Sequence, residues 1–147
     1  AVELAQNGHY RTFMGADQTT VTLRHGIITA TRGFPVNLIA QKMSIPTRSL
    51  FDSDNPKTYT KMQRHLTGES TLVTYEYKCT ITALPNEEPL NIFGKAHAVR
   101  RYAEICRREG RAFQNDYWVG RSDRVVWKSN QSISKEVGHV TFQRIVH

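Results

Sequence analysis

The chain has 147 residues, a length that fits one domain (residues 1–147) with a single core. No run of about 18 apolar residues occurs, so the sequence predicts no membrane-spanning helix. The formal net charge of +7 permits attraction to nucleic acid, anionic lipid or acidic polysaccharide. The basic residues are spread widely, and their one dense cluster lies between Arg100 and Arg111. That cluster is either a solvated face with excess positive charge or an anion-binding surface.

The first eleven residues include Glu3, Gln6, Asn7 and His9 and lack the apolar core of a signal peptide. If the protein is exported, we expect its targeting segment to have been removed or to lie outside this sequence.

The first strong pattern in the chain predicts a β-hairpin. Residues 19–24 alternate polar and apolar side chains, and residues 27–32 resume a run that favours strand. His25 and Gly26 lie between the two runs, and Gly26 can supply the positive φ that a tight turn requires. Pro35 ends the second strand, because proline cannot donate to a sheet ladder.

Residues 35–68 have a different pattern, which predicts a long, turn-rich connection marked by Pro46, Pro56 and Gly68. A short helix near residues 55–66 is one interpretation, because Pro56 would occupy the first helical position. The apolar residues of this stretch, at positions 59, 62 and 66, recur at helical spacing. An ordered loop is the alternative.

Strand patterns return after residue 71 and continue to the end of the chain. They alternate apolar and polar residues and are separated by turn signals such as Pro85, Gly120 and Gly138, with no helical pattern between them. The fold class is therefore all-β, an antiparallel meander that curls into a barrel or a sandwich. The predicted strands cover about 71–83, 90–103, 112–120, 124–133 and 137–146.

The two cysteines, Cys79 and Cys106, lie in or just after strand-like runs, and neither belongs to a CxxC motif. A zinc site is therefore not predicted, and no residue is assigned as a metal ligand. Two strands could bring the two sulfurs together, and a bridge across this loop would stabilise the fold by about 3–4 kcal/mol. Two buried free thiols are the equal alternative, because two cysteines say little about the redox compartment.

The residues that carry catalysis in known motifs are absent or isolated. Six histidines are scattered singly, and no P-loop, GxGxxG or Gly-x-Ser-x-Gly motif occurs. The pair Glu87-Glu88 is typical of a solvated turn, and Asp52 and Asp54 flank the predicted helix start. The sequence therefore predicts no enzyme and no cofactor.

Aromatic residues concentrate in two neighbouring predicted strands. In the first, Tyr117 and Val119 face one side of the sheet and Trp118 the other; in the second, Trp127 shares a face with Ser129. Each tryptophan either packs in the core or offers a platform on which a sugar ring stacks. In the second case the ligand-binding residues would be Trp118 and Trp127 with Arg100, Arg101, Asn115 and Gln131.

Three segments of the C-terminal half, residues 112–119, 126–131 and 138–145, resemble the F-x-N-x-Y-W, W-x-S-x-Q and Gly-containing series of the GfcB/YjbF family. Residues 17–39 resemble the first hairpin of that family, and Cys79 and Cys106 fall where it has a cysteine pair. The family consists of group 4 capsule or exopolysaccharide-operon lipoproteins of Gram-negative bacteria. The resemblance covers nearly the whole chain and is weakest over residues 41–68.

The resemblance implies an exported lipoprotein on the periplasmic face of the outer membrane, held by a lipid anchor that is absent from this chain. It implies an accessory role in polysaccharide production or export, with the polysaccharide or its export proteins as partners, and it favours the Cys79–Cys106 disulfide. It carries over no catalytic residues.

Two other functions are compatible with the sequence. A basic β-barrel could bind nucleic acid, but no RNP-like motif or single-faced basic stripe supports this, so nucleic acid is not the expected partner. A glycan-processing enzyme would need two carboxyl groups about 5–10 Å apart in a cleft. Its candidates are Glu76, Glu87, Glu88 and Asp116.

Overall fold

In a computed structural model, the chain is built almost entirely of β-strands; residues 2–7, 9–15, 17–85 and 87–144 are described. No helix among them is long and apolar enough to cross a membrane. The only helical element in this part of the chain is a 3-10 turn, η1 (Thr47–Ser49). The strands are β1 (Val2–Asn7), β2 (Tyr10–Met14), β3 (Thr20–Arg24), β4 (Ile27–Arg32), β5 (Asn37–Met43), β6 (Lys57–Leu66), β7 (Leu72–Leu84), β8 (Leu90–Ile92), β9 (Lys95–His97), β10 (Val99–Arg108), β11 (Arg111–Gly120), β12 (Val126–Ser134) and β13 (Gly138–Gln143).

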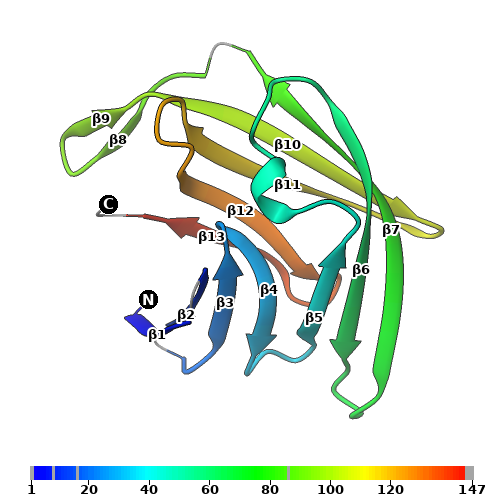
Figure 1. Cartoon of the computed structure of the whole chain (residues 1–147). Helices are drawn as coiled ribbons and strands as arrows, with labels where there is room; N and C mark the ends of the chain where they lie inside the picture. Colours follow the sequence, from blue (N-terminus) through cyan, green and yellow to red (C-terminus); the bar gives the residue numbers. More distant parts are fainter. Residues whose placement is uncertain (1, 8, 16, 86, 145–147) are drawn as a thin grey trace.

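The strands form two antiparallel sheets and one small hairpin. The larger sheet has the order β13-β12-β11-β10-β7-β6-β5, and the smaller has the order β1-β2-β3-β4. Strands β8 and β9 pair only with each other. Figure 1 shows the larger sheet curled into an open half-barrel, with the smaller sheet on its open side. The predicted all-β antiparallel meander is confirmed.

Strand β4 joins the two sheets through side chains. The backbone N–H of Ile28 donates to Oε1 of Gln131 on β12 at 2.9 Å. The backbone carbonyl of the same residue accepts from Nε2 of Gln41 on β5 at 3.0 Å. Two glutamine amides therefore satisfy backbone groups at a place where no strand ladder reaches them. This arrangement fixes the first hairpin against the half-barrel.

Aromatic side chains dominate the main core inside the half-barrel. Phe51, from the segment after η1, places its ring 5.2 Å from those of Tyr102 and Tyr117, and all three residues are buried. The segment that the sequence predicted to be a turn-rich connection thus supplies a core residue. Burial of one such ring stabilises the fold by about 1.5–3 kcal/mol.

The predicted helix near residues 55–66 is wrong, because this stretch is strand β6. Its buried positions alternate, and three of them are polar: Lys61, Gln63 and His65. A hydrophobic pattern cannot show an alternation whose inward positions are polar. The predicted connection over residues 35–68 likewise contains both β5 and β6.

The strand predicted over residues 90–103 is also corrected. Residues 90–97 form the β8–β9 hairpin, whose turn residues Phe93 and Gly94 both have positive φ. Strand β10 begins at Val99 and continues to Arg108, so Cys106 lies within a strand. The last two residues of the strand predicted over 137–146 lie outside the described residues, and β1 and β2 were not predicted.

Candidate functional site

Of the six predicted ligand-binding residues, Trp118 and Arg101 come together on the outer face of the half-barrel. They are opposed in the β10–β11 register, and Lys128 opposes Trp118 from β12. The guanidinium carbon of Arg101 lies 5.2 Å from the Trp118 ring centroid, and Nζ of Lys128 lies 4.9 Å from it. Trp118 is half-buried between two cations that reach it from opposite neighbouring strands.

Three other predicted residues, Trp127, Asn115 and Gln131, are at most 3% exposed. Asn115 accepts from the backbone N–H of Ser132 at 2.7 Å, and Gln131 donates to the carbonyl of Gly26 at 2.8 Å. Their polar atoms therefore join strands. The predicted faces of β11 and β12 are confirmed, since Tyr117 and Val119 are buried and Trp118 lies on the opposite face.

Arg100 lies apart from both groups, beside a small pocket of about 120 Å³. Its Nε is 3.5 Å from Oδ1 of Asp54, which also accepts from the Tyr102 hydroxyl at 3.3 Å. Asp54 thus binds side chains of β10 and does not cap a helix. The structure does not bring the six predicted residues into one site.

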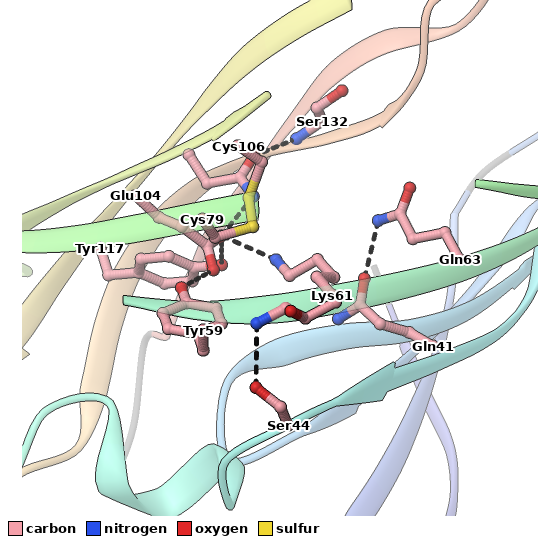
Figure 2. The surroundings of a disulfide bond; sticks show 12 residues. Gln41, Ser44, Tyr59, Lys61, Gln63, Cys79, Glu104, Cys106, Tyr117 and Ser132 are labelled. Atoms are coloured by element: carbon pink, nitrogen blue, oxygen red, sulfur yellow. Dashed lines mark hydrogen bonds and ion pairs between the residues drawn. A yellow bond between two sulfur atoms is a disulfide. The ribbon is translucent and has the colours of Figure 1, made fainter. Parts of the chain in front are cut away.

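A charged network that the sequence analysis missed lies inside the half-barrel, and Figure 2 shows it beside the disulfide. Glu104 on β10 is fully buried and forms an ion pair of 2.8 Å with buried Lys61 of β6. Asn115 donates to the same carboxylate oxygen at 2.8 Å, and the Tyr59 hydroxyl donates to the other. The Tyr117 hydroxyl lies 3.4 Å from Oε1 of Glu104.

Burial and hydrogen bonding oppose each other at Glu104. Burial acts to raise its pKa, but the charge of Lys61 and the hydrogen bonds from Lys61, Tyr59 and Asn115 hold that pKa below its usual range. Burial, together with the negative charge of Glu104, raises the pKa of Tyr59 and Tyr117. The network therefore consists of an ionised carboxylate fully satisfied by protein donors. This is the arrangement of a structural ion pair.

The disulfide lies next to this network. Cys79 on β7 and Cys106 on β10 face each other directly in the strand register and are bonded to each other. Together with Glu104 they are the only His, Cys, Asp and Glu side chains of the described residues that converge closely enough to hold a metal ion. Both sulfurs are committed to the bridge and the carboxylate to Lys61, so this cluster does not form a metal centre in the folded, oxidised chain.

A groove of about 500 Å³ lies between the smaller sheet and strand β5. This volume falls within the range of small-ligand sites, about 300–1,000 Å³. We call it the cationic groove, because its lining contains Arg24, Lys42 and Arg48 and no carboxylate. The full lining is His9, Tyr10, Arg24, His25, Thr29, Gln41, Lys42, Met43, Ser44, Ile45, Pro46, Thr47 and Arg48.

Histidine and tyrosine side chains shape one wall of the cationic groove. The rings of His9 and His25 lie 4.7 Å apart, and Nδ1 of His25 is 2.9 Å from the Thr47 hydroxyl. The guanidinium of Arg24 lies over the Tyr10 ring at 5.1 Å and donates to its hydroxyl at 3.2 Å. Burial, followed by electrostatic interaction with His9, Arg24 and Arg48, lowers the pKa of His25. The two arginines thus disfavour a further positive charge on His25.

The turn between β3 and β4 holds this wall in place. His25 and Gly26 have φ values of 52° and 82°, which form the tight hairpin turn that the sequence predicted. A Cβ on Gly26 would lie 2.6 Å from Val126 of β12, so only glycine permits this close approach. The hydrogen bond from Gln131 to Gly26 fixes the same turn. The groove wall is thus docked on the larger sheet.

Sequence reasoning missed the cationic groove because its residues come from three separate stretches: the β1–β2 turn, the first hairpin, and residues 41–48. The third stretch had been predicted to be part of a long, turn-rich connection. One sequence signal for the groove was available: an arginine, Arg24, is followed directly by a histidine, His25, at a predicted turn.

Comparison with known proteins adds a family and a solved fold. A family model described as group 4 capsule polysaccharide lipoprotein GfcB, YjbF, matches residues 1–145. The crystal structure of the hypothetical lipoprotein YmcC from Escherichia coli (K12) superposes with a TM-score of 0.79 and 18% identity, covering 97% of this chain and 77% of that one. At this identity the likeness shows the fold. No curated protein matches the chain.

Proposed function

The chain belongs to the YjbF family of group 4 capsule polysaccharide lipoproteins, and we propose that it is a non-catalytic accessory of polysaccharide production or export that contacts the glycan. Membership of this lipoprotein family implies a location in the cell envelope. Within the envelope we propose the periplasmic face of the outer membrane. Both cysteines of this sequence are bonded to each other, so a lipid-bearing cysteine would lie outside these 147 residues.

One observation supports contact with glycan: the cationic groove has the volume of a small-ligand site and a mixed polar and apolar lining. Tyr10, with 41% of its surface exposed, offers an aromatic ring and a hydroxyl at the groove, and Thr29 and Ser44 add further hydroxyls. Sugars present both apolar ring faces and hydroxyls, and such a mixed lining complements them. The proposed function is non-catalytic. In support, the buried carboxylate of Glu104 forms an ion pair with Lys61.

Affinity electrophoresis of the purified domain through gels that contain group 4 capsule polysaccharide tests this function. We expect the polysaccharide to retard the migration of the wild-type domain. We also expect the length of the polysaccharide chains to stay unchanged during long incubation with the domain. Tyr10→Ala should weaken retardation several-fold. Phe93→Ala is the matched control, because Phe93 is an aromatic residue 84% exposed on a distant hairpin.

Two results would reject the proposal. Shortening of the polysaccharide by the domain would reveal an enzyme. No retardation of the wild-type domain would remove the glycan contact, and a partner protein of the export machinery would become the better proposal. An oligonucleotide that competes with the polysaccharide at equal charge concentration would favour the nucleic-acid alternative.

The predicted surface around Trp118 and Arg101 remains a second place for glycan contact. The Trp118→Ala variant, measured in the same gels, tests it separately. If Arg101 and Lys128 already occupy the faces of the Trp118 ring, Trp118→Ala should lower stability slightly and leave the retardation by polysaccharide unchanged.

A further inference from the structure

The cationic groove contains positive charge that no described carboxylate compensates. Arg24, Lys42 and Arg48 all line it, and none of the three forms an ion pair with an acidic residue in the described part of the chain. By contrast, Arg100 and Arg101 pair with Asp54 and Asp116. Three cations that have no acidic partner among the described residues therefore share this one hollow.

Arg24 differs from an ordinary solvated arginine. It is half-buried, it stacks on Tyr10, and its Nε is buried without a hydrogen-bond partner among the described residues. Removing a charged donor from water without a partner costs stability, commonly about 1–3 kcal/mol or more. A bound anion would compensate this charge.

The other cations of the groove are arranged around the same space. Arg48, exposed in η1, follows Thr47, and the Thr47 hydroxyl contacts the His25 ring at 2.9 Å. His25 in turn follows Arg24 in the docked turn. Arg24 and Arg48 both line the groove with His25, and both act on it electrostatically, as does His9. A guanidinium group matches the planar geometry of a carboxylate and can bind it through two hydrogen bonds, and this groove has two such groups.

We propose that the cationic groove recognises the acidic sugars of a polysaccharide, with Arg24 and Arg48 contacting a sugar carboxylate. The proposal rests on the glycan contact proposed above and specifies its ligand class. Neutral segments of the polymer would lie over Tyr10 and the polar rim, while the acidic unit would set the register of the chain in the groove.

Calorimetric titration with oligogalacturonate, and with the same oligomers after reduction of their carboxyl groups, tests this ligand class. We expect the wild-type domain to bind the acidic oligomers at least 10-fold more tightly than the reduced ones at low salt. The preference should decline as salt rises from about 20 to 200 mM, because the groove is open to solvent.

Two charge-matched double variants locate the interaction. Arg24→Gln/Arg48→Gln should abolish the preference for the acidic oligomers. Arg64→Gln/Arg107→Gln removes the same net charge from exposed positions of β6 and β10, outside the groove, and should preserve that preference. Arg24→Lys keeps the charge but loses the planar fork, and we expect an intermediate affinity. Thermal unfolding of each variant verifies that it is folded.

Each contrary outcome has a distinct meaning. If carboxyl-reduced oligomers bind as tightly as acidic ones, the carboxylate proposal is overturned and the glycan contact stands. Equal weakening by the two double variants would also overturn it, because the attraction would then be due to net charge alone. If neither these oligomers nor the group 4 polysaccharide binds, both proposals fail together.

Discussion

At the scale of single residues, the interior of the half-barrel contains a buried ion pair. Glu104 and Lys61 are almost fully buried, and each satisfies the charge of the other. An ion pair of this kind adds little to stability compared with apolar residues of the same volume, but losing one partner leaves the other charge buried alone. We therefore expect the pair to specify which strand faces meet in the core.

The Glu104→Gln variant tests this account. It keeps the shape of the side chain but leaves Lys61 without its counter-ion, so we expect the free energy of unfolding to fall by about 3–5 kcal/mol. Urea unfolding measures the change. The control is Lys61→Met/Glu104→Leu, which removes both charges and should recover part of the lost stability, because Tyr59 and Asn115 still lose their acceptor. A loss below about 1 kcal/mol for Glu104→Gln would show that the pair is not needed.

At the scale of elements, the β3–β4 hairpin depends on one close contact with β12. Gly26 needs a positive φ, and it also needs space, because its missing Cβ would meet Val126. Gly110, in the β10–β11 turn, also has a positive φ, of 77°, but nothing lies within 4 Å of its Cβ position. A comparison of the two glycines therefore distinguishes the cost of a positive φ, which both positions share, from the cost of a steric clash, which only Gly26 has.

Gly26→Ala and Gly110→Ala should therefore differ in effect. We expect Gly110→Ala to cost about 1–2 kcal/mol for the left-handed backbone alone. Gly26→Ala should cost a further 1–3 kcal/mol or so, because the added methyl group displaces Val126. Chemical denaturation of both variants gives the comparison. Equal losses would mean that the turn is not docked tightly, and the groove wall would then lack its support.

The bridge between β7 and β10 belongs to the same scale. Cys79 and Cys106 join neighbouring strands across a sequence separation of 27 residues. We expect Cys79→Ala/Cys106→Ala to lower the free energy of unfolding by about 3–4 kcal/mol, because the unfolded chain gains freedom. Wild-type protein unfolded with and without reductant should show a similar difference. An unchanged unfolding midpoint on reduction would contradict this expectation.

At the scale of the whole molecule, buried titratable groups make the fold sensitive to acid. Burial lowers the pKa of His65, which is 3% exposed, so the folded chain favours its neutral form. The unfolded chain then binds more protons as pH falls below about 6.5, and stability decreases. Glu104, whose pKa is held low, contributes stability that is present at neutral pH and is lost as pH falls through its folded-state value.

The free energy of unfolding should therefore decline in two stages between pH 7 and strongly acidic pH. Urea midpoints measured across this range follow the decline. His65→Gln should reduce the stage that begins near pH 6.5, to which His25 also contributes because burial lowers its pKa, and should keep the stage at lower pH. Lys61→Met/Glu104→Leu should keep the first stage and remove the contribution of Glu104 to the second. A stability that stays flat from pH 7 to pH 4 would show that His65 does not contribute.

The sequence by itself determined the features that depend on local chemistry. The turn at His25 and Gly26 was predictable because few residues adopt positive φ, and the opposite faces of Tyr117 and Trp118 follow from the alternation of a strand. The family resemblance, which rests on short motifs in order, was likewise legible and is confirmed by the match over residues 1–145.

Only the tertiary structure decided the features that depend on distant partners. Strand β6 was misread as a helix because its inward residues Lys61, Gln63 and His65 are polar and become favourable inside only beside groups from other strands. Gln131 looked like a ligand-binding residue, but it pins β4 to β12. The cationic groove gathers Arg24 and Arg48 from separate elements. Spacing along the chain does not encode such a juxtaposition, because the folding of one sheet against the other creates it.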